Sequence, residues 1–409
     1  MSDEVPATTS SDASNSQPAA IRGPHAWLNW QAWRVGQPRR VNSRTHTSEV
    51  RPLWEEFGLY SDVRISGALR LGPYEILQGF PPEHGVPGAR LMLVLRAHDH
   101  LLDAMPEARG YEEQEITVYA GGDLGEQIAS LLALALARRV RSGGVTRIAF
   151  EDDPHGQPMA IHHYAPTLEA RRLRQMLPAA CDDTRLADAE CYLNTFAGVA
   201  SPDAVAIMRA ARQYADALWW ADLDPRISWI KLFGALEAAA DRWDVGVRPD
   251  SIVQLERRHK GMYNRLSKKV PDALPLVAKS ISGTLGAEGK LIDFALTYAP
   301  PPPATRPEFG LMDWDNLEVA LRVLYDHRSR DLHGGIPFPE PLCSPPLTDS
   351  NDYAAEAFPG MGATSGGGSW PADRLPMYLH TFAYITGEVL RSWWLGLPTD
   401  TKPEQVHTR

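Results

Sequence analysis

The sequence contains little cysteine, no long apolar run and no excess of positive charge. Only three cysteines occur among 409 residues, Cys181, Cys191 and Cys343, at spacings that fit neither a disulfide framework nor a zinc site. We therefore expect a reducing, cytoplasmic setting. The formal net charge of -10 argues against a protein that wraps nucleic acid over its whole surface, although it leaves room for a local basic patch.

Segments that direct a chain to or through a membrane are also missing. The most apolar run, residues 128–137, has about half of the roughly 20 residues needed to span a bilayer. The N-terminal residues are acidic and rich in serine, proline and alanine, and lack the basic and apolar regions of a signal peptide. We therefore predict no membrane span, a disordered tail over residues 1–21, and a short tail over 400–409.

The composition is that of a globular protein, with 44% apolar and 22% charged residues, and the length favours two or three domains, of which the patterns below define two. Residues 22–200 mix strand and helix patterns. One helix is predicted over residues 123–143, with Asp123 and Glu126 in capping-box spacing, arginines in its last turn and Gly143 at its end. We expect an α+β domain whose helix covers one face of a sheet. Five or six strands are expected, within residues 62–71, 74–80, 90–98, 114–122, 145–150 and 159–164.

Residues 201–399 carry helical patterns alone, and predict an all-α bundle that follows the α+β domain. Four main helices are expected, over residues 201–223, 225–243, 315–333 and 372–394, with shorter ones near 276–285 and 290–298. The stretch 334–371 is rich in glycine, proline and serine. So long a structureless connection is uncommon in a compact domain, and is usually either functional or disordered.

The predicted helix 315–333 places an arginine on its apolar stripe. The stripe advances by three and four residues, so the position after Leu324 is Arg328. A guanidinium is rarely buried without a partner. We expect Asp331, Glu237 or the phosphate of a ligand to supply one. The apolar stripe consists of Leu317, Ala320, Leu321 and Leu324.

The same helix delivers His333 just before Gly334 ends it. Five residues separate this histidine from Arg328, which places the two side chains about 140° apart around a regular helix. They would converge only if the last turn deforms, or if a second copy of the helix brings the complementary group. Alternatively, both side chains simply stabilise the C-terminal end of the helix.

Three segments of this half carry a resemblance to a known family. The segment "WIKLFGALEAAADRW" resembles the first core helix of the Apea-like branch of HEPN domains, "LYDHRSRDLHGG" resembles their R-x4-H motif, and "FAYITGEVLRSWW" resembles their closing helix. The resemblance covers roughly residues 201–397. The long connection at 334–371 departs from the family, which usually turns more briefly there.

The resemblance implies a metal-independent endoribonuclease that works as a homodimer, with two motifs facing a shared cleft. It implies catalytic roles for Arg328 and His333. From the chemistry of the reaction we expect Ser329 to orient the phosphate and Glu237 to orient Arg328. Such chemistry is available without a metal because the 2′-OH of RNA is an internal nucleophile. A neutral histidine suits the base that takes its proton, and a forked, permanently charged arginine suits the phosphate. We expect 2′,3′-cyclic phosphate ends, tolerance of EDTA, and no cofactor.

Other candidate residues are weaker. The basic segment 255–269 is explained first as a solvated helix face, and binding of an RNA backbone is the alternative. His98 and His100 share a strand face without an evident third ligand, so no metal is expected. His327 is expected to be a solvent or interface histidine. The candidate RNA-binding residues are Arg257, Arg258, Lys260, Lys268 and Lys269.

Three functions remain open. The first is a ribonuclease, by analogy a toxin or an abortive-infection effector of antiviral defence, whose residues 22–200 form a sensor or regulatory domain that binds a trigger or inhibitor. The second is a non-catalytic HEPN module that dimerises or binds RNA. The third is an unrelated helical scaffold, favoured if Arg328 pairs within its own subunit and His333 points to solvent.

Overall fold

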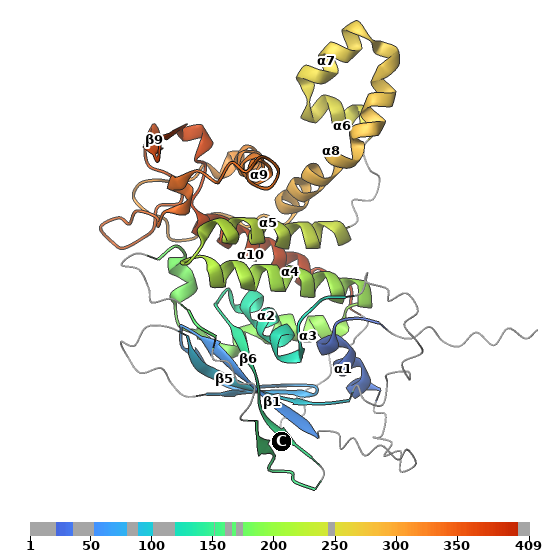
Figure 1. Ribbon diagram of the computed structural model, residues 1–409, viewed down its shortest axis with the longest axis vertical. Helices are drawn as coiled ribbons and strands as arrows, with labels where there is room; N and C mark the ends of the chain where they lie inside the picture. The colour runs from blue at the N-terminus through green and yellow to red at the C-terminus, as the bar shows by residue number, and fades with distance from the viewer. Residues whose placement is uncertain are drawn as a thin grey trace, which may run out of the picture.

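The protein has an α+β fold, in which an antiparallel sheet near the N-terminus is followed by a helical region (Figure 1). The computed structural model describes residues 22–35, 53–79, 89–100, 119–150, 152–159, 166–168, 175–243 and 250–399. The predicted tails, 1–21 and 400–409, lie outside these residues. Within the described residues, no helix combines the length and the apolar character that crossing a membrane requires.

The main sheet has six strands in the order β3-β4-β5-β1-β6-β7, and all neighbours are antiparallel. The central strand, β1, was not predicted, because its last five residues are all buried and show no alternation. Residues 119–122 of one predicted strand belong to no strand, and the rest of that segment and residues 160–164 lie outside the described part. The strands are β1 (Trp54–Ser61), β3 (Leu69–Leu71), β4 (Tyr74–Gln78), β5 (Arg90–His98), β6 (Arg141–Ala149) and β7 (Gln157–Pro158). A separate parallel pair joins β2 (Ile65–Ser66) to β8 (Thr184–Arg185).

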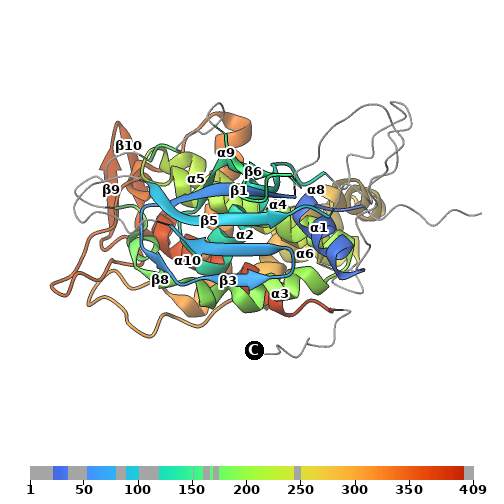
Figure 2. The ribbon, with the colours of Figure 1, turned by 90° about the horizontal axis from the view of Figure 1, so that it is seen from below.

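One face of the sheet carries a ladder of alternating charges across five strands. Arg70 lies 2.6 Å from Glu75, and Arg96 reaches both Glu75, at 3.7 Å, and Glu56, at 2.7 Å. Arg147 lies 3.6 Å from the other oxygen of Glu56. Seen from below, this sheet lies in front of the helices (Figure 2). Because opposite charges alternate along the ladder, it offers a polyanion such as RNA little net attraction.

Helix α2 (Leu124–Leu136) packs against the opposite face of the sheet. Its predicted start is confirmed, since Asp123 and Glu126 form a complete capping box. Gly125 allows the close approach to β1, because a Cβ there would lie 2.4 Å from the ring of Phe57. The predicted end at Gly143 is wrong. The helix stops at Leu136 because Ala137 adopts a left-handed conformation, with φ of 52°.

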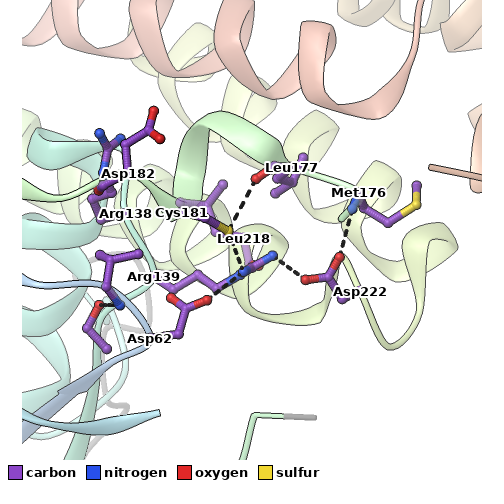
Figure 3. A network of polar contacts seen from close by, with 11 residues as sticks. Asp62, Arg138, Arg139, Met176, Leu177, Cys181, Asp182, Leu218 and Asp222 are labelled. Carbon is purple, nitrogen blue, oxygen red and sulfur yellow. Dashed lines mark hydrogen bonds and ion pairs between the residues drawn. The ribbon is translucent and has the colours of Figure 1, made fainter. Parts of the chain in front are cut away.

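The arginines expected in the last turn of α2 instead leave the helix, and Arg139 becomes the centre of a buried polar network (Figure 3). Its Nη1 lies 2.8 Å from Asp62 and its Nη2 lies 2.6 Å from Asp222, while Nε donates to the carbonyl of Leu218. The second oxygen of Asp222 accepts a hydrogen bond from the backbone N–H of Met176. The network therefore joins the end of β1 to the end of α4 (Ser201–Trp220) and to the segment that contains Met176.

The four main helices predicted after residue 201 are confirmed as α4, α5, α9 and α10, although the last begins at Leu379 rather than near 372. Two short helices were expected before α9, but a single 24-residue helix, α8, spans that region. In Figure 1, α4 lies above α2, and α5 lies above α4. Besides α2 and α4, the α-helices are α1 (His25–Arg34), α3 (Glu190–Gly198), α5 (Pro225–Arg242), α6 (Ser251–Arg258), α7 (Lys260–Lys269), α8 (Leu274–Thr297), α9 (Leu317–Gly334) and α10 (Leu379–Leu395).

One buried cluster of apolar side chains runs from α1 to α10, without a break near residue 200. Arg391 of α10 is buried and donates from Nη1 to the carbonyl of Leu134 in α2, at 3.0 Å. The sheet and the helical region therefore share a core.

The connection 334–371 is ordered by packing rather than by long elements. Phe338 stacks on Trp229 of α5 with ring centroids 5.4 Å apart, and the indole of Trp229 donates to the carbonyl of Leu342. Glu356 accepts two hydrogen bonds from Arg306, at 2.6 and 2.8 Å. A 3-10 helix (Glu340–Cys343) and a hairpin of β9 (Gly362–Ser365) and β10 (Gly368–Pro371) complete it. The expectation of a structureless connection is therefore wrong.

Candidate functional site

Helices α5 and α9 bring Glu237 and Arg328 together. Glu237 follows the buried Leu236 on α5, and Arg328 lies one turn after the buried Leu324 on α9, so both stand at the edge of the core. The Nη2 of Arg328 lies 2.7 Å from Oε2 of Glu237. The side chain of Arg328 is 16% exposed and that of Glu237 is 34% exposed, so water reaches the pair from one side. Glu237 was one of the two acidic partners expected from the sequence.

Tyr325 is a further member of this site. The guanidinium carbon of Arg328 lies 5.4 Å from the centre of its ring, and the ring packs edge-on against Phe233. The spacing of three residues before Arg328 is the sequence signal for such a contact. The aromatic face therefore holds the cation from one side while Glu237 holds it from another.

The guanidinium of Arg328 has donors to spare. Of its five N–H groups, one is seen to donate, to Glu237, among the residues that the structure describes. The buried Nε has no acceptor there. Since an arginine fork matches two oxygens of a phosphate, the remaining donors suit an anion that approaches from the exposed side.

Burial controls the ionisation of the two neighbours of Arg328. It raises the pKa of Glu237 above the usual value, Asp241 raises it further, and Arg328 opposes the shift. Burial also raises the pKa of Tyr325, again against the effect of Arg328. The phenol of Tyr325 is therefore neutral at neutral pH, and cannot compete with a phosphate for the arginine as an anion would.

His333 stands apart from this pair. It lies in the last turn of α9 and is exposed, and no hydrogen bond or ion pair joins it to Arg328 within the described part of the chain. Ser329 is half-buried and has no hydrogen-bonding partner among the same residues. Gly334 still belongs to the helix, and Gly335, with φ of 63°, adopts the left-handed conformation that ends it. One chain thus brings together two of the four predicted catalytic residues.

One of the alternative partners of Arg328 is not used, and the expectation for His327 is wrong. Asp331 does not pair with Arg328, because it is buried and lies 2.5 Å from Arg226 of α5. His327 does not face solvent, because it lies three residues after Leu324 on the apolar stripe. Its Nε2 lies 2.9 Å from the carbonyl of Arg374, and burial lowers its pKa, so it is a neutral core histidine at neutral pH.

The predicted basic segment lies on α6 and α7, away from the body of the protein (Figure 1). Lys260, Lys268 and Lys269 are exposed, and none forms an ion pair with another described residue. Arg257 and Arg258 belong to α6, and the placement of their side chains lies outside what the structure describes.

Other binding features do not coincide with this site. Within the described ranges, no group of three or more histidine, cysteine or carboxylate side chains is arranged to hold a metal ion. A cavity of about 490 Å³ lies beside the Arg139 network, and no candidate catalytic residue lines it. Its lining includes Arg141, Trp219, Trp220 and Asp222.

No protein-family model matches the chain, and no curated protein or solved structure is significantly similar to it.

Proposed function

We propose that the protein is a metal-independent endoribonuclease of the HEPN type that works as a homodimer. The observation that carries the proposal is the half-buried Arg328, which Glu237 and Tyr325 hold at the surface with donors unused. The same helix presents the exposed His333 one and a half turns later. A phosphate ligand and a nearby base are what cleavage by a 2′-OH requires.

In this mechanism His333 takes the proton of the 2′-OH, and the 2′-oxygen attacks the adjacent phosphorus. The bond from phosphorus to the 5′-oxygen of the next nucleotide breaks, and this leaving oxygen takes a proton from water. Arg328 stabilises the negative charge that builds on the phosphate oxygens, and Ser329 donates a hydrogen bond to one of them. Glu237 fixes the orientation of Arg328. The products are a 2′,3′-cyclic phosphate and a 5′-hydroxyl.

The separation of the two side chains around α9 is the reason for a dimer. A second copy of α9 would place its own histidine near the arginine of the first. Two apolar side chains flank His333 and favour such a contact, because Leu332 is 45% exposed and Ile336 is 58% exposed.

The sheet-bearing half would act as the regulator of this ribonuclease. Its shared core with the helical half provides a physical route for a bound trigger or inhibitor to change the α9 surface. We propose a cytoplasmic toxin or abortive-infection effector of antiviral defence, by the analogy that the HEPN resemblance provides.

A second candidate function is that of a non-catalytic helical module, which would be a scaffold unrelated to the HEPN ribonucleases. A specific observation favours it, because Arg328 is paired within its own chain and His333 is exposed, which is the arrangement expected of a scaffold. The two functions differ in whether RNA is cut.

Cleavage should depend on the sugar of the substrate and not on metal. With EDTA present, purified protein should cut an RNA oligonucleotide and leave 2′,3′-cyclic phosphate ends, which mass spectrometry of the fragments detects. A single 2′-deoxy sugar at a mapped cut should abolish that cut and leave the others unchanged, because the nucleophile is missing. Cutting at the deoxy position, or cutting that needs added magnesium, would contradict the mechanism.

A further inference from the structure

Helices α6, α7 and the first half of α8 form an arm that projects from the body of the protein (Figure 1). The arm has a small core of its own, in which Leu255 and Ala278 are fully buried. Tyr263 and Leu266 of α7 pack against them, partly exposed. Since the described side chains of the arm add nothing to the main buried cluster, the stability of the body does not explain the presence of the arm.

The outward surface of α7 is basic. Measured around the helix from Lys260, the other cations lie at about 80° for Lys268, 140° for Arg265 and 180° for Lys269. Tyr263 and Leu266, which pack inward, lie at about 300° and 240°, on the opposite side. All four cations are exposed and none has an ion-pair partner within the described residues.

The charge of the arm contrasts with that of the whole chain. Residues 251–269 contain six arginines and lysines and one acidic residue, in a chain whose net charge is -10. Tyr263 and Leu266 of α7 pack inward, and Met262, at 38% exposed, is a single apolar side chain among four exposed cations. This outward surface favours a hydrated polyanion over a lipid bilayer, into which several apolar side chains would have to insert.

Helix α8 connects this surface to the candidate site. Glu288 of α8 lies 3.1 Å from Arg322 of α9, one turn before Tyr325. From Glu288 back to the start of α8 at Leu274, the helix rises about 21 Å at 1.5 Å per residue. At roughly 3.4 Å per nucleotide along a strand, this length corresponds to about six nucleotides.

We propose that the arm binds the backbone of RNA about six or more nucleotides from the phosphate held by Arg328, so that the substrate is a long RNA rather than a short oligonucleotide. This inference rests on the proposed function and names its substrate class. The bond broken remains at Arg328, and the arm supplies affinity by neutralising phosphates.

The test compares binding of an uncleavable 2′-O-methyl RNA of 30 nucleotides with that of one of four nucleotides, by fluorescence anisotropy. The arm variant carries Lys260→Gln, Lys268→Gln and Lys269→Gln. Its matched control carries Arg64→Gln, Arg70→Gln and Arg185→Gln, which remove as many exposed cations from the sheet-bearing half.

For the long RNA, the arm variant should bind at least tenfold more weakly than wild type at 0.1 M salt. The slope of log K against log salt should fall by up to about 2, at roughly 0.7 for each lost contact with a single strand. The control should bind as wild type does, and the four-nucleotide RNA should not distinguish the three proteins.

The proposal is overturned if arm and control variants bind the long RNA equally, or if wild type binds vesicles of anionic phospholipid and no RNA. Binding is measured without cleavage, so the two proposals can fail separately. If the protein binds long RNA through the arm but cuts none, the proposal for the arm stands and the proposal of a ribonuclease fails.

Discussion

Replacement of Arg139 by methionine is expected to lower the free energy of unfolding by about 3–5 kcal/mol. The side chain is fully buried, and its loss would leave the carboxylates of Asp62 and Asp222 in the interior without their cation. An uncompensated buried charge costs more than the ion pair itself contributes. Urea denaturation followed by circular dichroism measures the change.

The neighbouring Arg138 provides the control. It reaches the carbonyl of Asp182 at 2.6 Å and takes no part in the ion pairs of Arg139, so Arg138→Met should cost less than about 1 kcal/mol. A triple variant, with Arg139→Met, Asp62→Leu and Asp222→Leu, should recover part of the stability, because no buried charge of the network is then left unpaired. Equal losses in the two single variants would show that the network does not hold the sheet to the helices.

Replacement of Arg328 by alanine is expected to reduce the rate of RNA cleavage by a factor of about 10²–10³, because the transition state loses its main source of positive charge. Glu237→Gln should have a smaller effect, since glutamine retains an oxygen that accepts the hydrogen bond from Arg328. Cleavage of a fluorescently labelled RNA under single-turnover conditions measures both rates.

Arg330 is the matched control for Arg328. It lies two residues further along α9, is 52% exposed and pairs with Asp326 at 3.1 Å. Arg330→Ala removes the same charge from the same helix and should leave the rate within about threefold of wild type, since surface ion pairs contribute little. Cleavage by the Arg328→Ala variant at the rate of wild type, with the fold intact by circular dichroism, would contradict the assigned role.

The sequence predicted the parts of the fold that depend on local signals. The capping box at Asp123 located the start of α2, and helical periodicity located α4, α5 and α9. Strand β1 was missed because it is buried at the centre of the sheet, and buried strands lack the alternation that reveals them. The end of α2 was missed because Arg139 is buried in ion pairs with Asp62 and Asp222, which are distant in the sequence and give no local signal.

The sequence predicted part of the candidate site and missed the rest. The position of Arg328 on the apolar stripe predicted that the guanidinium has a partner, and Glu237 is that partner. The spacing could not choose between Glu237 and Asp331, because the choice depends on Arg226 of another helix. His327 lies three residues after Leu324, which is the same spacing that places residues on the apolar stripe. The helical pattern therefore predicts that His327 is buried, as the structure shows.

The most direct test of the proposed ribonuclease is cleavage of transfer RNA and bulk cellular RNA by the full-length protein in EDTA, with wild type and His333→Ala side by side. Wild type should cut the RNA and leave 2′,3′-cyclic phosphates. The variant should be equally folded, because His333 is exposed, and should cut at least a hundredfold more slowly, because it lacks the proposed base. Equal cutting by both proteins would contradict the role of His333. No cutting by either, in the presence of long RNA that both bind, would favour the non-catalytic helical module.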